Sequence, residues 1–509
     1  MPESVSQHCL RPVGRASAVL VCAAVAWAVL ITSAFGQPLQ APLEQLAASR
    51  QLGAASVGVV ILDADAGMPL AGLRSDERFI PASNMKLLTS GVALHVLSPR
   101  FEFRTTLEFD EAGRRLIVRG AGDPAFGDPV LLEDMGLTPE AFVDVWATAA
   151  AEALREAEMA GVDEIVIDDR VFDRVPVHET WPVEQLNRWY CAEVSGLNFH
   201  TNCVSVYPRP SVVAGQPALL NLVPELPWLE IENKTRTVSQ GKHTAWAARG
   251  HMSNDISVFG DVRFASDPIE VTVHDPALQF GRLLAHRLSL MEVEVGTVRL
   301  ADPDESLPEQ RVLHTVRSPM ETVLRRINVR SQNMYAESVL KRIGAEVAGP
   351  PGSWDSGSAI VRMVINDRLG PSAGESLVAA DGSGMSRENR VTPGLLADWL
   401  RSFHDDEALG PELIASMPGP GEGTLRTRFQ SARLTNEVRA KSGYLRGVSA
   451  LSGYVTHEES GRRVVFAVMV NDPPSGVARA TIRRFEEQVV ELADQWLSEQ
   501  VMLTSQVTP

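Results

Sequence analysis

The sequence predicts a mixed α/β (α+β) protein in which a sheet flanked by helices is assembled from the two ends of the chain. Near the N-terminus, an apolar strand pattern over 56–62 precedes a helix pattern over 83–97. Near the C-terminus, two apolar strand patterns within 448–471 precede an amphipathic helix over 478–497. Residues 101–300 differ in texture, with short strand patterns and a proline-rich middle. We therefore expect a core built from both ends of the chain and largely β insert domains between them.

The same changes of texture predict the domain boundaries. Mixed α/β patterns over 101–172 and 268–300 flank the segment 173–267, which has short alternating strands and no long amphipathic helix. This arrangement predicts one insert domain with a second one nested inside it. The predicted units are a leader over 1–36, a core from 37–100 and 301–509, a first insert domain from 101–172 and 268–300, and a nested insert domain over 173–267.

Local signals predict the remaining elements. The clearest helix begins after Thr138, an N-cap residue followed by Pro139 at the first helical position, and we expect Gly161 to stop it. The charged, proline-bearing segment 301–310 is expected to be a connection. Periodicity further predicts helices over 42–52, 277–290, 320–328 and 331–343, and strands over 104–109, 115–119, 164–168, 204–207, 219–223, 269–273 and 437–442.

Charge and composition exclude one broad class of function. The chain has 509 residues, a net charge of −17 and a pI near 5.2. Such an acidic chain argues against a nucleic-acid-binding surface and for a soluble enzyme or binding protein. Only five of its residues are lysines, so a lysine at a motif position is informative here.

The N-terminus predicts export. Arg11 and Arg15 form a basic region, Ala16–Leu30 is almost entirely apolar, and residues 34–36 supply the small side chains that precede a cleavage site. The alternative is an uncleaved anchor, because the apolar stretch is just long enough to span a bilayer. The prediction is a periplasmic or otherwise extracytoplasmic protein, with peripheral or N-terminal membrane association if the leader is kept.

Two cysteines lie outside the leader. Cys191 and Cys203 form an even pair in a chain predicted to be exported, so a disulfide that closes a short loop is one interpretation. Two buried free thiols are the alternative. Two cysteines do not make a zinc site, and the histidines contain no H-E-x-x-H pair, so we expect no metal and no cofactor.

A serine and a lysine at the start of one predicted helix are the first candidates for catalysis. In Ser83-Asn84-Met85-Lys86 the two side chains lie on one helix face, roughly 5–6 Å apart at Cβ. A lysine can take the proton of a serine nucleophile once burial has lowered its pKa. The S-x-x-K pattern is weak alone, and the chain contains it three times: Ser83/Lys86, Ser239/Lys242 and Ser338/Lys341.

Two further motifs distinguish the first pair. Only Asn333 has a serine two positions before it, in Ser331-Gln332-Asn333, and only Lys441 is followed by a hydroxyl residue and glycine, in Lys441-Ser442-Gly443. The order S-x-x-K, S-x-N, K-S-G is that of serine acyl-transfer enzymes that act on penicillins. The pair at 239/242 lies in a predicted insert loop, and the pair at 338/341 lies downstream of S-x-N.

With these motifs the chain resembles the low-molecular-mass class C penicillin-binding proteins, the penicillin-binding protein 4 type of D-alanyl-D-alanine carboxypeptidase/endopeptidase. The resemblance extends over residues 40–497. Gln332 stands where that family often has aspartate, and Ser442 where threonine is usual, but both keep the groups that do chemistry. The other matching segments are 122–124, 190–195, 318–319, 328–337, 381–387, 423–425 and 448–454.

The resemblance implies a penicillin-recognising serine DD-peptidase/β-lactamase-like core and the roles of its residues. Ser83 would attack the D-Ala-D-Ala carbonyl, Lys86 would be its general base, and Ser331 would pass a proton to the leaving amine. Asn333 would hold the substrate amide. Lys441 and Ser442 would face the terminal carboxylate, Gly443 would allow close approach, and the N–H groups of Ser83 and Tyr444 would form the oxyanion hole.

Two residues keep two interpretations each. Arg387 is either a second contact for a substrate carboxylate or a structural salt-bridge partner. Tyr190 either lines the pocket for the donor peptide or is an ordinary packing aromatic beside the cysteines.

The function implied is hydrolysis of peptidoglycan stem peptides and cross-links through an acyl-enzyme, with β-lactam antibiotics as covalent inhibitors. A serine β-lactamase is one alternative, but the long insert is not needed for it and no hydrolytic glutamate is identifiable. A catalytically silent wall-binding relative is the other, and the complete set of motif side chains argues against it.

Overall fold

A computed structural model describes residues 37–507, with side chains as far as residue 504. The predicted leader over 1–36 lies outside the described residues, so its cleavage or retention stays a prediction. Within residues 37–507, no helix combines the length and the apolar character needed to cross a bilayer.

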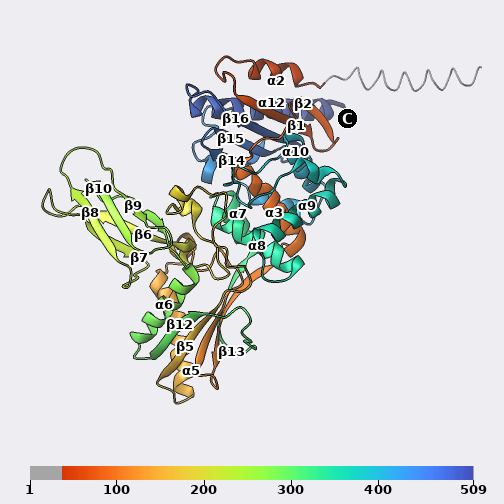
Figure 1. Ribbon diagram of the computed structural model, residues 1–509. Coiled ribbons are helices and arrows are strands. Elements are labelled where there is room, and N and C mark those ends of the chain that lie inside the picture. The colour runs from red at the N-terminus through yellow and green to blue at the C-terminus, as the bar shows by residue number, and fades with distance from the viewer. Residues whose placement is uncertain (1–36, 508–509) are drawn as a thin grey trace, which may run out of the picture.

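The core sheet joins the two ends of the chain (Figure 1). Its antiparallel strands lie in the order β14-β15-β16-β1-β2. β1 pairs with β16 over its whole length, from Ser56 opposite Asn471 to Asp63 opposite Val464. The core sheet predicted from the sequence is therefore present. Its strands are β1 (Ser56–Asp63), β2 (Met68–Leu73), β14 (Glu437–Leu445), β15 (Val448–Thr456) and β16 (Arg463–Asn471).

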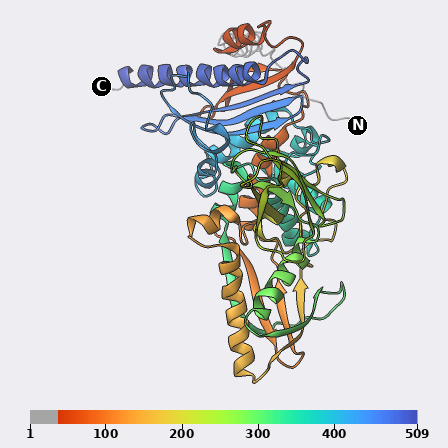
Figure 2. The ribbon, with the colours of Figure 1, turned by 90° about the vertical axis from the view of Figure 1, so that its left-hand side faces the viewer.

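Helices cover both faces of this sheet, which is why β1, β15 and β16 are buried almost throughout. Val59 and Ile61 of β1 pack in the cluster that contains the residues of α12, and Figure 2 shows α12 lying along that face. Val60 and Leu62 point the opposite way, towards α3 and α10. The core helices are α2 (Gln40–Ala47), α3 (Met85–Leu97), α7 (Met320–Asn328), α8 (Asn333–Ala348), α9 (Trp354–Leu369), α10 (Pro393–His404), α11 (Gly410–Ala415) and α12 (Arg479–Val507).

The first insert is a second five-stranded sheet, in the order β12-β5-β4-β3-β13, which lies at the bottom of Figure 1. Thr138 caps α5 through the backbone N–H of Ala141, as predicted, but α5 ends at Glu156 and Gly161 begins the next strand. The elements are β3 (Glu102–Asp110), β4 (Arg115–Arg119), α4 (Pro129–Asp134), α5 (Pro139–Glu156), β5 (Gly161–Asp168), α6 (Pro276–Ser289), β12 (Glu294–Leu300) and β13 (Arg311–Pro319).

The nested insert, at the left of Figure 1, consists of two small sheets in the orders β11-β6-β7 and β8-β10-β9. As the sequence predicts, it has no long helix among its described residues. The strands are β6 (Cys203–Arg209), β7 (Leu219–Val223), β8 (Ile231–Thr237), β9 (Trp246–Arg249), β10 (Ile256–Val262) and β11 (Ile269–Thr272).

Two predicted boundaries need correction. Residues 301–509 are predicted as core, but β13 pairs with β3 and so belongs to the sheet of the first insert. Residues 268–300 are predicted as part of the first insert, whereas β11 pairs with β6 of the nested insert. The physical reason is that strand patterns are local, while the sheet a strand joins depends on partners far away in the sequence. The other boundaries stay predictions.

The disulfide interpretation is wrong, because Cys191 and Cys203 are both free and buried. Each thiol packs in the apolar interior. Burial raises the pKa of Cys191 to about 12 and that of Cys203 further still, so both stay protonated at neutral pH. The pair therefore behaves as two small apolar side chains.

Candidate active site

Ser83 lies in a tight turn (Ala82–Asn84) that leads directly into α3. Asn84 holds this turn against the core sheet: its side-chain amide donates to the backbone carbonyl of Lys441 at 2.7 Å and accepts from the hydroxyl of Ser452 at 2.8 Å. Gly443 is needed at this contact, because a Cβ there would lie 2.9 Å from the carbonyl oxygen of Pro81. Strand β14 and the serine turn are thus in van der Waals contact.

Lys86 is fully buried one helical turn after Ser83. Its Nζ donates to the Ser83 hydroxyl at 3.2 Å, to Oδ1 of Asn333 at 2.7 Å and to the backbone carbonyl of Ser383 at 2.8 Å. Burial lowers its pKa towards neutral pH, while the charges of Glu337 and Asp381 act in the opposite direction. All three hydrogen-bond partners are neutral, so an uncharged amine can exist here and accept a proton.

Lys441 and Ser331 form the second pair in the site. The Nζ of Lys441 donates to the Ser331 hydroxyl at 2.9 Å and to the backbone carbonyl of Ser442 at 2.7 Å. Burial, and then the nearby charge of Lys86, lowers the pKa of Lys441 well below its usual range. Ser331 has a φ of 59°, so the backbone turns sharply just before α8 begins at Asn333.

Asn333 links the core to the nested insert. Its Oδ1 accepts from Lys86, and its amide nitrogen donates to the backbone carbonyl of Tyr190 at 2.8 Å. The Nε1 of Trp181 also donates to Asp381, at 3.0 Å. The segment 181–190, which the sequence analysis placed in the nested insert, therefore contacts the site directly.

The remaining predicted residues lie at the rim. Tyr444 is about half exposed, with the guanidinium of Arg479 over its ring at 3.6 Å. Arg387 donates to the backbone carbonyl of Arg446 at 2.9 Å. The ring of Tyr190 meets that of Trp189 edge-on. Among the described residues Arg387 forms no ion pair, so its salt-bridge interpretation is wrong, and contact of Arg387 or Tyr190 with substrate stays a prediction.

The other two S-x-x-K pairs lie in different surroundings. Ser239 and Lys242 are exposed in the nested insert. Ser338 and Lys341 are buried, and the Nζ of Lys341 pairs with Asp173 at 2.5 Å. Within the described part of the chain, only the first pair is hydrogen-bonded to the S-x-N motif, at Asn333, and that motif is bonded in turn to K-S-G through Ser331 and Lys441.

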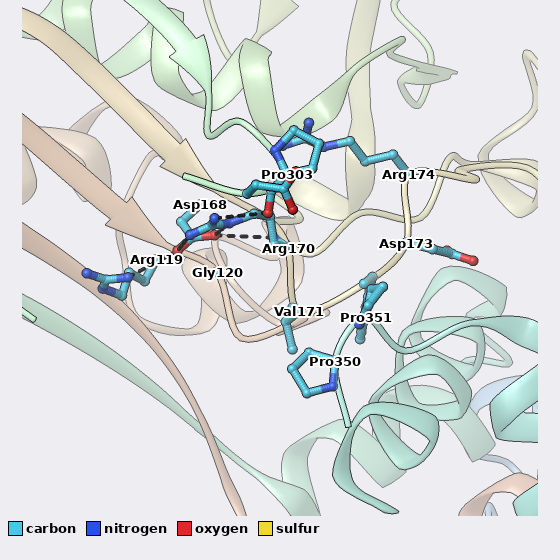
Figure 3. Close-up of a pocket in the computed structure, with 12 residues that line it drawn as sticks. Arg119, Gly120, Asp168, Arg170, Val171, Asp173, Arg174, Pro303, Pro350 and Pro351 are labelled. Carbon is cyan, nitrogen blue, oxygen red and sulfur yellow. Dashed lines mark hydrogen bonds and ion pairs between the residues drawn. The ribbon is translucent and has the colours of Figure 1, made fainter. Parts of the chain in front are cut away.

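A separate cavity lies away from these residues. It has a volume of about 790 Å³ and lies between the first insert and the core (Figure 3). None of the predicted site residues lines it. Its arginines are already paired: Arg119 and Arg170 both bind Asp168, and Arg174 binds Asp169.

One cluster has the donor types of a metal site, namely Glu193, His274 and Asp275 in the inserts. The carboxylate of Glu193 already accepts from the buried guanidinium of Arg249 at 2.9 Å and from the backbone N–H of Asp275 at 3.0 Å. These bonds explain the cluster as a structural ion pair.

Comparison with known proteins identifies the family. Residues 39–496 match the model of the D-Ala-D-Ala carboxypeptidase 3 (S13) family. The chain belongs to this family. A D-alanyl-D-alanine carboxypeptidase from Actinomadura sp. (strain R39) is 31% identical over 450 residues, which cover 84% of this chain and 79% of the relative. The D-alanyl-D-alanine carboxypeptidase DacB of Haemophilus influenzae is 22% identical over 453 residues, covering 85% of this chain and 90% of the relative.

A solved structure confirms the fold of this S13 family member. Penicillin binding protein 4 from Haemophilus influenzae superposes with a TM-score of 0.71 at 21% identity, covering 88% of this chain and 98% of that one. The predicted penicillin-recognising core with inserts is therefore confirmed. The predicted class C penicillin-binding-protein type and the enzyme class, a serine-type DD-peptidase hydrolase, are likewise confirmed.

Sequence reasoning missed three contributors to the site. Asn84 anchors the serine turn, the Ser383 carbonyl is an acceptor for Lys86, and the Tyr190 carbonyl is an acceptor for Asn333. The position of Asn84 inside S-x-x-K was visible in the sequence. The two carbonyls were not, because backbone acceptors leave no residue-type signal.

Proposed function

We propose that Ser83 is the nucleophile and Lys86 its general base in hydrolysis of the D-alanyl-D-alanine bond. The supporting observation is the buried Lys86 amine 3.2 Å from the Ser83 hydroxyl, with neutral partners only. Ser83 Oγ forms a bond to the carbonyl carbon as its proton passes to Lys86. The backbone N–H groups of Ser83 and Tyr444 stabilise the oxyanion, since β14 lies against the serine turn.

Collapse of the tetrahedral intermediate breaks the C–N bond and releases D-alanine. The leaving amine takes its proton from the Ser331 hydroxyl, which Lys441 holds at 2.9 Å and which is replenished from the protonated Lys86. Water then attacks the acyl-enzyme, with Lys86 again as base. Lys441 and Ser442 face the substrate carboxylate, and Asn333 faces the substrate amide. Cleavage of a D-alanyl cross-link uses the same residues.

Covalent labelling with a fluorescent penicillin, followed by peptide mass mapping, tests these roles. We expect one adduct, on Ser83, and its loss in Ser83→Ala. Ser239→Ala is the matched control, because it removes the serine of the exposed S-x-x-K pair and should label like the wild type. An adduct on another residue, or none on folded protein, contradicts the assignment. Rapid turnover of the adduct would favour the β-lactamase alternative.

The physiological substrate and location are part of the same proposal. The substrates are peptidoglycan stem peptides and their D-alanyl cross-links, β-lactams are covalent inhibitors, and the protein acts outside the cytoplasm. Measuring D-alanine release from a pentapeptide and cleavage of cross-linked dimers side by side compares the carboxypeptidase activity with the endopeptidase activity. The mass of the N-terminal peptide of the exported protein tests cleavage of the predicted leader.

A further inference from the structure

A buried carboxylate lies directly behind the site and has no role in the mechanism above. Glu337 is on α8, one turn after Asn333, and its side chain is fully buried. Residues spaced four apart share one helix face. The same face of α8 therefore presents Asn333 to Lys86 and Glu337 to the loop that follows Asp381.

Glu337 holds this loop by its backbone. Its two oxygens accept from the N–H groups of Gly382 and Ser383, each at 2.8 Å, and from Nε1 of Trp354, also at 2.8 Å. The loop approaches α8 closely, because a Cβ on Gly382 would lie 2.7 Å from the carbonyl oxygen of Ala336. Burial raises the pKa of Glu337 to about 7, whereas its three N–H donors act in the opposite direction, towards the ionised form, and orient the backbone that bears them.

One residue connects the carboxylate to the catalytic amine. The N–H of Ser383 donates to Glu337, and the carbonyl of the same Ser383 accepts from Lys86 at 2.8 Å. The carbonyl of Gly382 accepts from the hydroxyl of Thr89, one turn along α3 from Lys86, also at 2.8 Å. The loop is thus held between α8 and α3.

From this geometry we propose that Glu337 is a positioning residue for acylation, which orients the Ser383 carbonyl towards Lys86 and places negative charge behind that lysine. The inference rests on the proposed roles of Ser83 and Lys86. Glu337 would have two effects on Lys86: its hydrogen bonds orient the carbonyl that holds the Lys86 amine, and its charge influences the pH at which that amine loses its proton.

The charge effect has a defined sign. Glu337 raises the pKa of Lys86 against the larger lowering by burial. The other charged groups that face Lys86 are Asp381 from the loop, which also raises its pKa, and Lys441 from β14, whose own pKa is lowered by burial and then by the charge of Lys86. The nearby Cys191 thiol stays neutral because its pKa is raised. Removing only the charge of Glu337 should therefore lower the pKa of Lys86 and leave the amine neutral at more acidic pH.

Three variants separate these effects. Glu337→Gln removes the charge and mismatches one donor, Glu337→Asp keeps the charge but shortens the side chain, and Trp354→Phe removes one donor and keeps the charge. The measurement is the rate of Ser83 acylation by a chromogenic β-lactam as a function of pH, with a thermal unfolding curve for each protein.

In the pH profile of the acylation rate, the acid limb is the range in which the rate rises with pH, before it reaches a plateau. For Glu337→Gln we expect this acid limb to lie at least about 0.5 pH unit lower than in the wild type, and the plateau rate to be reduced about tenfold or more. Glu337→Asp should keep the wild-type limb with a reduced plateau. Trp354→Phe should keep the limb and a plateau within about threefold of wild type. A merely structural carboxylate would change unfolding temperature and plateau without moving the limb.

An unmoved acid limb in folded Glu337→Gln overturns the proposal. If that variant does not fold, Glu337→Asp decides, since a plateau equal to that of Trp354→Phe also overturns it. Failure of the proposed function is distinguishable, because the wild-type protein would then form no Ser83 adduct at any pH.

Discussion

Lys86 on α3 and Lys341 on α8 are both buried and both follow a serine by three residues, but their amines have different hydrogen-bond partners. The amine of Lys86 meets a hydroxyl, an amide oxygen and a backbone carbonyl. The amine of Lys341 meets the carboxylate of Asp173, the carbonyl of Val175 and the face of the Trp354 ring at 3.8 Å. Burial lowers the pKa of both lysines, so burial alone does not distinguish them.

The direct partner makes the difference. A carboxylate in contact and an aromatic face both stabilise a cation, so Lys341 is held as an ammonium that joins α8 to the segment after β5. No carboxylate contacts the Lys86 amine directly; the carboxylate of Glu337 binds the N–H of Ser383, whose carbonyl accepts from Lys86. Burial among neutral acceptors thus suits the general base proposed for Lys86, whereas burial against a charge suits the structural lysine Lys341. The S-x-x-K spacing is common to both and decides neither.

The largest effect is expected from removing the amine of Lys86. Lys86→Met should lower the rate of acylation by β-lactams by about 10³-fold or more, because the Ser83 hydroxyl loses its base. Its stability should fall little, since no carboxylate is left unpaired in contact with it. Stopped-flow acylation together with thermal unfolding measures both. Acylation near the wild-type rate would contradict the assignment of the base.

Lys341→Met should produce the reverse pattern. The substitution leaves Asp173 without its cation and removes the charge over the Trp354 ring, so we expect unfolding free energy to fall by about 2–4 kcal/mol. Acylation of the folded fraction should stay within about tenfold of wild type. Equilibrium denaturation with penicillin titration of folded sites tests this. A loss of acylation as large as that in Lys86→Met would remove the distinction between the two lysines.

Asp123 extends the comparison to a buried acid with no cation in its hydrogen bonds. It accepts from the Ser318 hydroxyl at 2.6 Å and from the N–H of Ala125, and burial raises its pKa to about 7. The folded state therefore binds a proton more tightly than the unfolded state. The contribution of Asp123 to stability should be greatest below its unfolded pKa, near 4, and fall as pH rises towards 7, by on the order of 1–4 kcal/mol.

Asp123→Asn should flatten this part of the stability curve, because the amide can donate to Ser318 and accept from Ala125. Denaturant midpoints between pH 4 and pH 8, for the variant beside the wild type, give the measurement. Parallel curves would show that the acid is not the group that titrates.

Local sequence patterns predicted the helices and strands of this fold better than they predicted which strands and which cysteines pair. The core strands β15 and β16 and helix α7 lie where their apolar patterns place them. Strand β13 was missed, because its half-exposed pattern is weak and its pairing with β3 spans the whole insert. The disulfide was one interpretation of the even number of cysteines, but an even number does not show that two thiols are bonded, and both are free in the apolar interior.

The site shows the same limit. Motif order singled out Ser83, Lys86, Ser331, Asn333 and Lys441, and hydrogen bonds join these residues in the structure. The carbonyls of Ser383 and Tyr190 complete the arrangement, but any residue type supplies a carbonyl. Their contribution depends on where the chain passes, which only the assembled fold determines.

The smallest effect is expected at the third S-x-x-K pair. Ser239 and Lys242 are both exposed in the nested insert, so solvent hydrates the ammonium. Lys242→Met should change unfolding free energy by less than about 0.5 kcal/mol and acylation by less than about twofold. The same unfolding and acylation measurements apply. A larger effect on acylation would mean that this exposed lysine meets substrate, and that burial does not separate the Ser83/Lys86 pair from the exposed pair.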